Sequence, residues 1–234
     1  MKYSFTWNGT NSRDKGLFLQ EMPLIVRPEE RVEHVTIPGR SGELTITEGV
    51  DVFNSYIQTV HVLVDSLEHV KDIQYWLTGD GYVTFSCEPL RKQRARVINA
   101  VEFKKYSRNS SFWEADVQFY CEPLKQALTE DVINITETGQ QVENPGDVAS
   151  RPQITVIGGS GNVTIRIGTR AINLKSLSDT VIVDCEAEWV TDDEGEPLPN
   201  VYTGSFPIIG VGTKTVQVTG TFTKLEIQPR WRYL

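Results

Sequence analysis

Histidine and cysteine are scarce in this sequence, and neither residue forms a recognisable pattern. The 234 residues contain only three histidines and three cysteines. Cys87, Cys121 and Cys185 form an odd and widely separated set, which predicts reduced thiols rather than a disulfide framework. No HExxH, CxxC or mixed Cys/His spacing occurs, so the sequence predicts no metal ligand and no cofactor.

The motifs that organise catalysis are also missing. There is no Gly-x-Ser-x-Gly nucleophile elbow and no phosphate-binding Walker loop. Gly158-Gly159-Ser160-Gly161 lies between two alternating apolar segments. A phosphate loop needs a helix N-terminus after it, so this stretch predicts a tight turn. We therefore predict no catalytic residue and expect the protein not to be an enzyme.

Basic residues and long apolar runs are both in short supply. Twenty-three Lys and Arg face 31 Asp and Glu, a net charge of -8, which argues against sequence-specific nucleic-acid binding. The densest apolar run, 60–64, is too short to cross a membrane. The first residues show no apolar run of a signal peptide, so we expect assembly in a cytoplasm.

Short alternating segments rich in Val, Ile and Thr dominate the chain, which predicts a mainly β fold, all-β with one helix. Asn8-Gly9 is typical of a tight hairpin turn. Pro38–Gly42 predicts a loop between two paired strands. The segments expected as strands are 3–7, 17–21, 32–37, 43–47, 56–64, 82–86, 96–103, 113–120, 153–157, 162–167, 170–174, 180–185, 214–218 and 221–227.

One helix is predicted, at about 66–78. Asp65 and Glu68 have the spacing of a capping box, and Gly79 supplies the stop. The spacing predicts an apolar stripe that lies across a sheet and buries Trp76. The stripe comprises Leu67, Val70, Ile73, Trp76 and Leu77.

Two domains are predicted, 1–135 and 136–234. Turn-forming residues are frequent between Thr129 and Ser150, and the chain beyond reads as short strands about ten residues apart, typical of a β-sandwich. Within the first domain, 83–90 and 117–124 both read as a strand that stops at Cys-Glu-Pro-Leu.

Two clusters of like charge stand out. Asp184, Glu186 and Glu188 lead into the acidic turn 192–196, and we interpret them as a solvated hairpin, with a calcium site or a catalytic carboxylate pair as alternatives. The second cluster predicts a charged loop or a patch that faces an acidic partner. Its members are Arg91, Lys92, Arg94 and Arg96.

Several stretches together resemble the distal tail protein (Dit) of long-tailed, non-contractile phages, over nearly the whole chain. The most specific stretch is 35–44, Val-Thr-Ile-Pro-Gly-Arg-Ser-Gly-Glu-Leu. The others are 5–9 with Ser12 and Gly16-Leu17, then 73–77 leading to 83–86, Asn144-Pro145-Gly146 with Ser150-Arg151-Pro152, 182–184, 204–209 and 227–232. An asparagine expected shortly after Gly212 is missing, and Lys214 stands there.

This resemblance implies a ring, usually of six copies, at the tip of a phage tail. The N-terminal domain would form the ring between the tail tube protein and the tail-tip hub protein. The second domain would be a galectin-like β-sandwich that carries receptor-binding or adsorption proteins. Ring closure needs one surface repeated in every copy. The candidate contact residues are Ile37, Pro38, Gly39, Arg40, Ser41, Gly42, Arg91, Lys92, Arg94 and Arg96.

Two other functions stay open. A galectin-like domain implies a carbohydrate-binding module that contacts host cell-surface sugars, and Trp189 and Trp231 could stack on a sugar ring. The second half has no histidine, which weakens this hypothesis. A tail-associated hydrolase would need a catalytic acid pair or a metal ligand set, and neither stands out.

Overall fold

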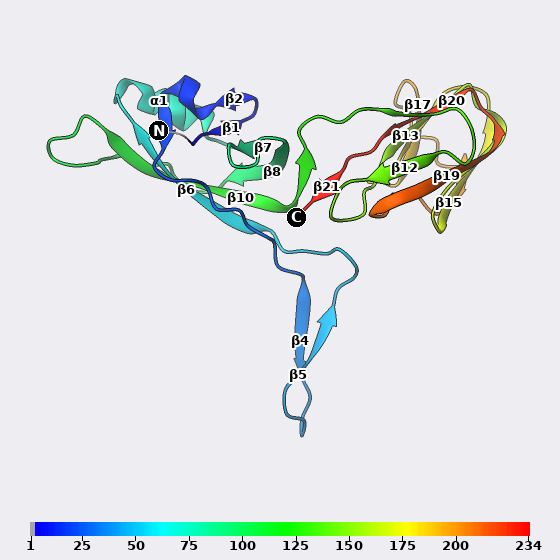
Figure 1. Cartoon of the computed structure of the whole chain (residues 1–234), viewed down its shortest axis with the longest axis horizontal. Helices are drawn as coiled ribbons and strands as arrows, with labels where there is room; N and C mark the ends of the chain where they lie inside the picture. The colour runs from blue at the N-terminus through cyan, green and yellow to red at the C-terminus, as the bar shows by residue number, and fades with distance from the viewer. Residues whose placement is uncertain (1–2) are drawn as a thin grey trace. The chain divides into compact units, whose positions relative to one another are not determined.

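The computed structural model describes residues 3–234, which form two compact units. Residues 3–128 make up the first unit and residues 129–233 the second (Figure 1). The sequence predicts the division between residues 135 and 136. The contacts assign 133–135 to the second unit because these residues pair with a strand near the C-terminus.

The first unit is built around one antiparallel sheet with strand order β2-β1-β7-β8-β10-β6-β3, and β9 pairs with β10. A separate hairpin, β4–β5, stands beside it. The elements are β1 (Phe5–Trp7), β2 (Thr10–Asn11), the 3-10 helix η1 (Ser12–Lys15), β3 (Leu17–Leu19), β4 (Val32–Thr36), β5 (Glu43–Thr47), β6 (Tyr56–Val64), α1 (Glu68–Trp76), β7 (Asp80–Phe85), β8 (Arg91–Val97), β9 (Lys104–Lys105) and β10 (Trp113–Ala127).

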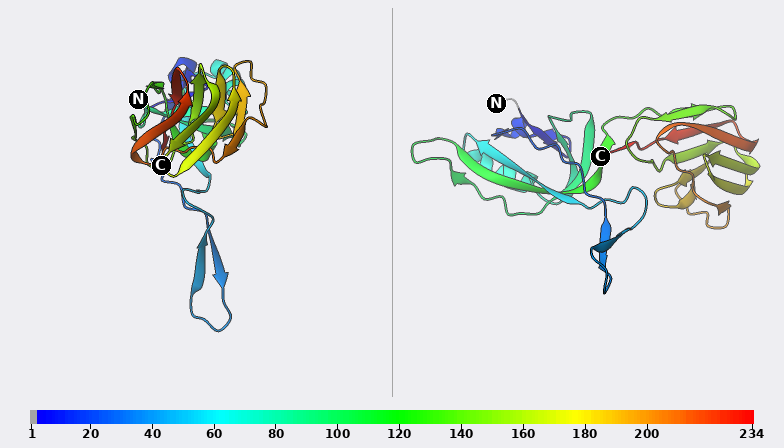
Figure 2. Two further views of the ribbon diagram at one scale, coloured as in Figure 1. Left: turned by 90° about the vertical axis from the view of Figure 1, so that its right-hand side faces the viewer. Right: turned by 60° about the horizontal axis from the view of Figure 1, so that its bottom comes forward.

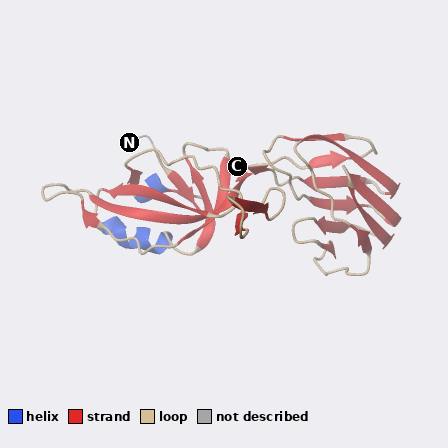
Figure 3. Cartoon of the chain, turned by 90° about the horizontal axis from the view of Figure 1, so that it is seen from below, coloured by secondary structure: helices blue, strands red, loops and turns tan. Residues whose placement is uncertain are grey.

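The core of the first unit gathers on one face of this sheet. Every second residue is buried from Gln58 to Val64 in β6 and from Ala115 to Cys121 in β10, as the alternating sequence predicts. Phe119 sits at the centre, with its ring centroid 5.3 Å from that of Phe5 and 5.4 Å from that of Trp7. Helix α1 covers this face with Val70 and Ile73. Among the described residues, helix is confined to the first unit (Figure 3).

The predicted helix exists, but its predicted start is wrong. Leu67 rather than Asp65 is the N-cap residue, and its side chain makes no capping hydrogen bond. The Ser66 hydroxyl accepts from Glu68 N–H at 3.2 Å, and Asp65 lies 3.4 Å from the His69 ring. Leu67 is exposed rather than part of the buried stripe. Trp76 is half-buried and stacks on Phe5 at 5.7 Å.

Two strand predictions in the first unit are also wrong. The cationic segment 91–96 belongs to β8, a central strand, rather than to a loop, and 98–103 is not a strand. Pro123 does not end β10. Three residues, 122–124, stand opposite Arg94 of β8 as a bulge, and pairing resumes at Lys125. Proline is tolerated there because a bulged residue needs no ladder hydrogen bond.

The second unit is a β-sandwich of two five-stranded antiparallel sheets with one apolar core between them. Their strand orders are β11-β20-β13-β16-β17 and β12-β19-β14-β15-β18. The strands are β11 (Ile133–Ile135), β12 (Gln141–Asn144), β13 (Gln153–Ile157), β14 (Ser160–Ile167), β15 (Arg170–Leu177), β16 (Val181–Asp184), β17 (Trp189–Asp192), β18 (Tyr202–Gly204), β19 (Gly212–Thr221) and β20 (Lys224–Gln228), followed by β21 (Arg232–Tyr233).

Two sequence motifs of the second unit have clear structural roles. Of the segment 158–161, only Gly158 and Gly159 lie between β13 and β14, where they carry the chain from one sheet to the other, and Ser160 and Gly161 begin β14. In Asn144-Pro145-Gly146, the buried Asn144 amide donates to the carbonyls of Val148 and Ile209 and accepts from Gly146 N–H. This side chain therefore ties three backbone segments together. The mainly β fold with one α-helix is confirmed.

Candidate interaction surfaces

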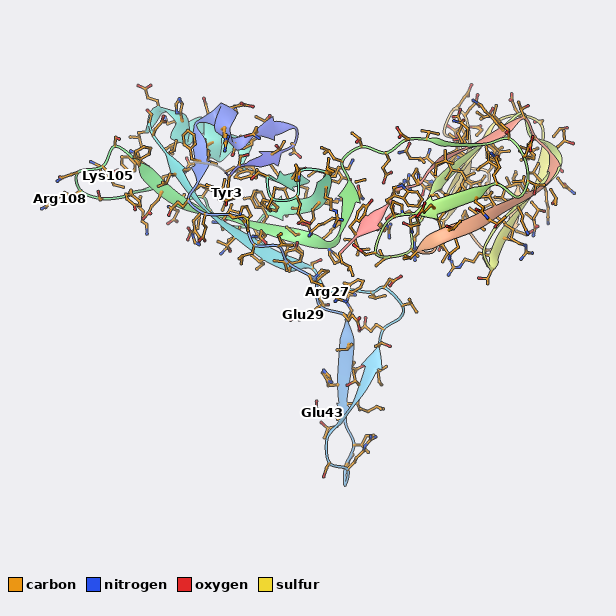
Figure 4. The ribbon with its side chains drawn as sticks, viewed as in Figure 1. Tyr3, Arg27, Glu29, Glu43, Lys105 and Arg108 are labelled. Atoms are coloured by element: carbon orange, nitrogen blue, oxygen red, sulfur yellow. The ribbon has the colours of Figure 1, made fainter. Side chains whose placement is uncertain are left out.

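The most prominent surface feature of the first unit is the β4–β5 hairpin, which we call the arm (residues 32–47; Figures 1 and 2). None of its residues is buried. Figure 4 labels Glu43 on the arm and Arg27 and Glu29 near its base. A two-stranded hairpin is at best marginally stable alone in water. Packing against a partner surface would therefore stabilise the arm.

The arm has one apolar and one polar face. Residues directly opposite in an antiparallel pair share a face, so Val35, Leu44 and Ile46 lie on one side, together with Glu33 opposite Ile46. Leu44 and Ile46 are 41% and 44% exposed. The other face is polar, and its His34 Nδ1 lies 3.2 Å from the Thr45 hydroxyl. An uncovered apolar face of this kind is typical of a contact surface.

The tip of the arm is the predicted loop, and it contains the first group of candidate contact residues. Gly39 and Gly42 have φ values of +80° and +82°, which favour glycine. Arg40 N–H donates to the Ile37 carbonyl at 3.1 Å, so the loop is a defined turn. Across residues 3–234, the Arg40 guanidinium has no ion-pair partner. The tip therefore presents one unpaired positive charge beyond an apolar face.

The second group of candidate contact residues lies on β8 and is locally neutralised. Arg94 and Arg96 lie 3.5 Å and 3.3 Å from Glu122 and Asp80. Lys92 Nζ stands 5.3 Å from the centre of the Tyr82 ring. This group lies on the main sheet and residues 37–42 at the end of the separate β4–β5 hairpin, so the structure does not bring the two groups together. Arg94 and Arg96 are paired with neighbouring carboxylates.

Two adjoining cavities along β6 were not foreseen from the sequence. The larger, about 470 Å³, is mainly polar and is lined by Gln20, His61, Asn99, Ala100, Glu102, Lys104, Glu114, Ala115 and Asp116. The smaller, about 210 Å³, is lined by Glu21, Met22, Pro23, Leu24, Val26, Ile57, Gln58, Thr59, Val60 and His61. They share His61, whose Nδ1 lies 2.6 Å from the Asp116 carboxylate. No motif marks these residues, because they meet only through strand pairing.

A buried polar cluster lies behind the β10 bulge. Lys125 Nζ lies 2.7 Å from the Glu88 carboxylate. Nearby, the Tyr56 hydroxyl donates to Gln93 Oε1 at 3.0 Å, and burial raises the pKa of Tyr56 to about 12. These groups satisfy one another, so we assign them a structural role.

The acidic run of the second unit lies on a hairpin, β16–β17, as the sequence predicts, but its carboxylates do not share one strand face. Asp184 ends β16 and accepts two hydrogen bonds of 2.9 Å from the Arg230 guanidinium. Glu186 lies in the turn after β16, so it does not share a strand face with Asp184. It pairs with Arg232. Burial opposes ionisation of Asp184, but the bonds from Arg230 and two backbone N–H groups lower its pKa.

Within residues 3–234, no group of three His, Cys, Asp or Glu side chains is placed to hold a metal ion. In the same range, no helix has the length and apolar character needed to cross a membrane. All three cysteines are free, and Cys121 and Cys185 are buried. Trp189 is 55% exposed on the edge strand β17.

No protein-family model matches this chain, and no curated protein matches it in sequence. Among solved structures, it is similar to the Dit (gp 19.1) protein of SPP1, which is described as a paradigm of the hub adsorption apparatus in phages that infect Gram-positive bacteria. The TM-score is 0.80 and the match covers 99% of each chain, at 16% sequence identity. The resemblance to the distal tail protein family is thus confirmed at the level of fold.

Proposed function

We propose that this chain is a structural component of a phage tail tip or baseplate, where copies of it form a ring of six. The observation that carries the proposal is the full-length similarity in fold to a tail hub adsorption protein. A partial match could reflect one common β module. A match over 99% of both chains instead includes both units and the arm.

The arm supports ring formation by one repeated contact. A ring needs heterologous contacts, in which one surface of each copy binds a different surface of the next. An exposed two-stranded arm with an apolar face is suited to such a contact. We place the primary contact at residues 37–42 and their flanking strands. The β8 cations Arg91, Lys92, Arg94 and Arg96 are a second candidate surface toward another partner.

The ring would join the tail tube protein to the tail-tip hub protein, and the second unit would serve as a galectin-like platform for receptor-binding or adsorption proteins. The chain would be assembled in the host cytoplasm and reside in the virion at the tail tip. Its role is geometric rather than enzymatic. A net charge of -8 suits a channel through which DNA passes without being bound.

Native mass spectrometry of the purified full chain, with negative-stain imaging of the same sample, tests this function. We expect a six-fold mass and ring-shaped particles. If the chain stays monomeric alone, adding the tail tube protein encoded in the same phage genome should produce the ring. A chain that remains monomeric at high concentration and with the tube protein would overturn the proposal.

A sugar-binding role for the second unit is the competing hypothesis, and the exposed Trp189 is the observation that favours it. A glycan array with the full chain tests it. Binding that is lost in Trp189→Ala and retained in Trp231→Phe would support a carbohydrate-binding module. Absence of binding across the array would leave the platform role as the function of this unit.

A further inference from the structure

The outer edge of β6 is open over part of its length. On one side β6 pairs with β10 throughout, but on the other it pairs with β3 only at 62–64. Gln20 N–H donates to the His61 carbonyl at 2.9 Å, so His61 and every second residue before it turn their backbone groups to this edge. Ile57 and Thr59 therefore present N–H and C=O groups that no described backbone segment pairs.

The smaller cavity runs along this open edge. The chain after Gln20 continues beside β6 as residues 21–26, and about 210 Å³ of space separates the two. Met22, Leu24 and Ile57 line it and are exposed. Ile57 and Thr59 lie on the outward face of β6, while Gln58 and Val60 turn their side chains to the core. An unpaired strand edge bordered by apolar side chains suits an incoming extended segment that pairs with it.

The larger cavity continues this groove beyond His61 and changes its character. The carboxylates of Glu102, Glu114 and Asp116 line it. Lys104 also lines it and lies 3.3 Å from the Glu114 carboxylate. Glu21 lies at the junction, with its carboxylate 3.8 Å from His61 Nε2. The groove is thus apolar at one end and negatively charged at the other. Its ligand should be an extended segment with alternating apolar residues followed by a positive charge.

We propose that this groove binds the arm of a second copy of the chain. Residues 35–37 match the apolar part of this pattern, because Val35 and Ile37 alternate on one face at the end of β4, and the unpaired Arg40 follows in the turn at the tip. β4 pairs only with β5, so its outer edge is free to extend a sheet. Val35 and Ile37 would enter the apolar part, and Arg40 would reach the acidic part. This inference rests on the proposed ring and names the surface that receives the arm.

Disulfide cross-linking of the full chain tests the groove directly. In a Cys87→Ser background, Ile37→Cys is combined with Leu24→Cys, whose native side chain is 73% exposed at the groove. Mild oxidation should give a ladder of covalent multimers. The matched control combines Ile37→Cys with Tyr75→Cys, an 82% exposed position on α1, and should give no ladder.

Native mass spectrometry of the same samples separates the two proposals. A hexamer with the Leu24 ladder supports both. A hexamer without that ladder, or with an equal ladder from the Tyr75 control, overturns the groove and leaves the ring. A ladder from a species of another size supports the groove and overturns the ring of six. A monomer without a ladder, both alone and with the tail tube protein present, overturns both.

A mixing experiment tests the groove without cysteines. Ile37→Asp should inactivate the arm and Ile57→Asp the groove, and both side chains lie outside the core. Each variant alone should be monomeric with unchanged melting temperature. A one-to-one mixture should give dimers, since one intact arm and one intact groove remain. A mixture that stays monomeric, or an Ile57→Asp variant that still forms the ring, would overturn the groove.

Discussion

Lys125 and Glu88 form a buried ion pair with 2.7 Å between Nζ and the carboxylate, and the lysine side chain is 5% exposed. Lys125 follows the bulge of β10, and Glu88 lies in the turn between β7 and β8. Glu88 belongs to the first Cys-Glu-Pro-Leu sequence of the chain, and Lys125 directly follows the second. The pair therefore fixes the position at which β10 resumes pairing with β8.

Glu88→Gln should destabilise the first unit strongly, because it leaves the Lys125 charge buried without a counter-charge. We expect a loss of about 3 kcal/mol in the free energy of unfolding, measured by urea denaturation. Adding Lys125→Met should recover most of this loss, since no buried charge then remains. Arg96→Ala, which breaks the exposed pair with Asp80, should cost less than about 1 kcal/mol. Equal losses in the two single variants would contradict a special role for the buried pair.

The Arg230–Asp184 contact should make the second unit sensitive to acid. The lowered pKa of Asp184 means that its contribution to stability is complete above its ordinary value of 3.8 and is lost as the pH falls through the folded-state pKa. At pH 7, Asp184→Asn should cost about 1.5–3 kcal/mol. The stability difference from wild type should shrink steadily below pH 3.8. Asp193→Asn, at an exposed carboxylate of the next turn, should show no such convergence.

Gly220 in β19 should not tolerate a side chain. Its φ is +109°, and an added Cβ would lie 2.2 Å from the Asn162 carbonyl oxygen. Gly139 has a φ of +91° with no atom within 4 Å of an added Cβ. Gly139→Ala should therefore cost only the backbone strain, about 1–2 kcal/mol, whereas Gly220→Ala should cost more or prevent folding. Similar melting temperatures for the two variants would contradict this prediction.

The local pattern of the sequence predicts the arm, the Asn8-Gly9 turn and most long strands, because alternation and turn residues act over a few positions. It does not predict β8. Arg91, Lys92, Arg94 and Arg96 read as a loop, yet alternate residues such as Gln93 and Ala95 face the core, which only the neighbouring strands reveal. The predicted helix cap is wrong for a more local reason, since Asp65 lies 3.4 Å from the ring of His69, four residues further along the chain.

Of the two candidate surfaces, the sequence predicts the tip of the arm but not the groove along β6. Residues 37–42 are visible in the sequence because proline and two glycines punctuate an alternating hairpin. The groove along β6 is not, because His61 and Asp116 are 55 residues apart and meet by strand register. The local excess of acidic residues does not reveal that Asp184 is paired, because its partner Arg230 lies 46 residues further along the chain.

The three thiols should differ sharply in reactivity. Burial raises the pKa of Cys121 and of Cys185 to about 12, and it also raises the pKa of the partly exposed Cys87. At pH 7.5 a thiol reagent should modify one cysteine slowly in the folded protein and all three in urea. Peptide mapping should identify Cys87 as the first site, and Cys87→Ser should abolish folded-state labelling. Rapid modification of two or more thiols would contradict the burial described here.

Removal of the arm should abolish assembly without unfolding the chain. Arg31 and Glu48 flank the arm and are joined by a backbone hydrogen bond of 3.3 Å, and Arg31 N–H also donates to Val52. Residues 32–47 can therefore be replaced by a short Gly-Ser turn while the base stays closed. Because no arm residue is buried, the melting temperature should change by less than about 2 °C. Size-exclusion chromatography with light scattering should show a monomer, whereas Val50→Ser, at the exposed base, should leave the ring intact. A ring formed without the arm would place the contact between copies elsewhere on the first unit.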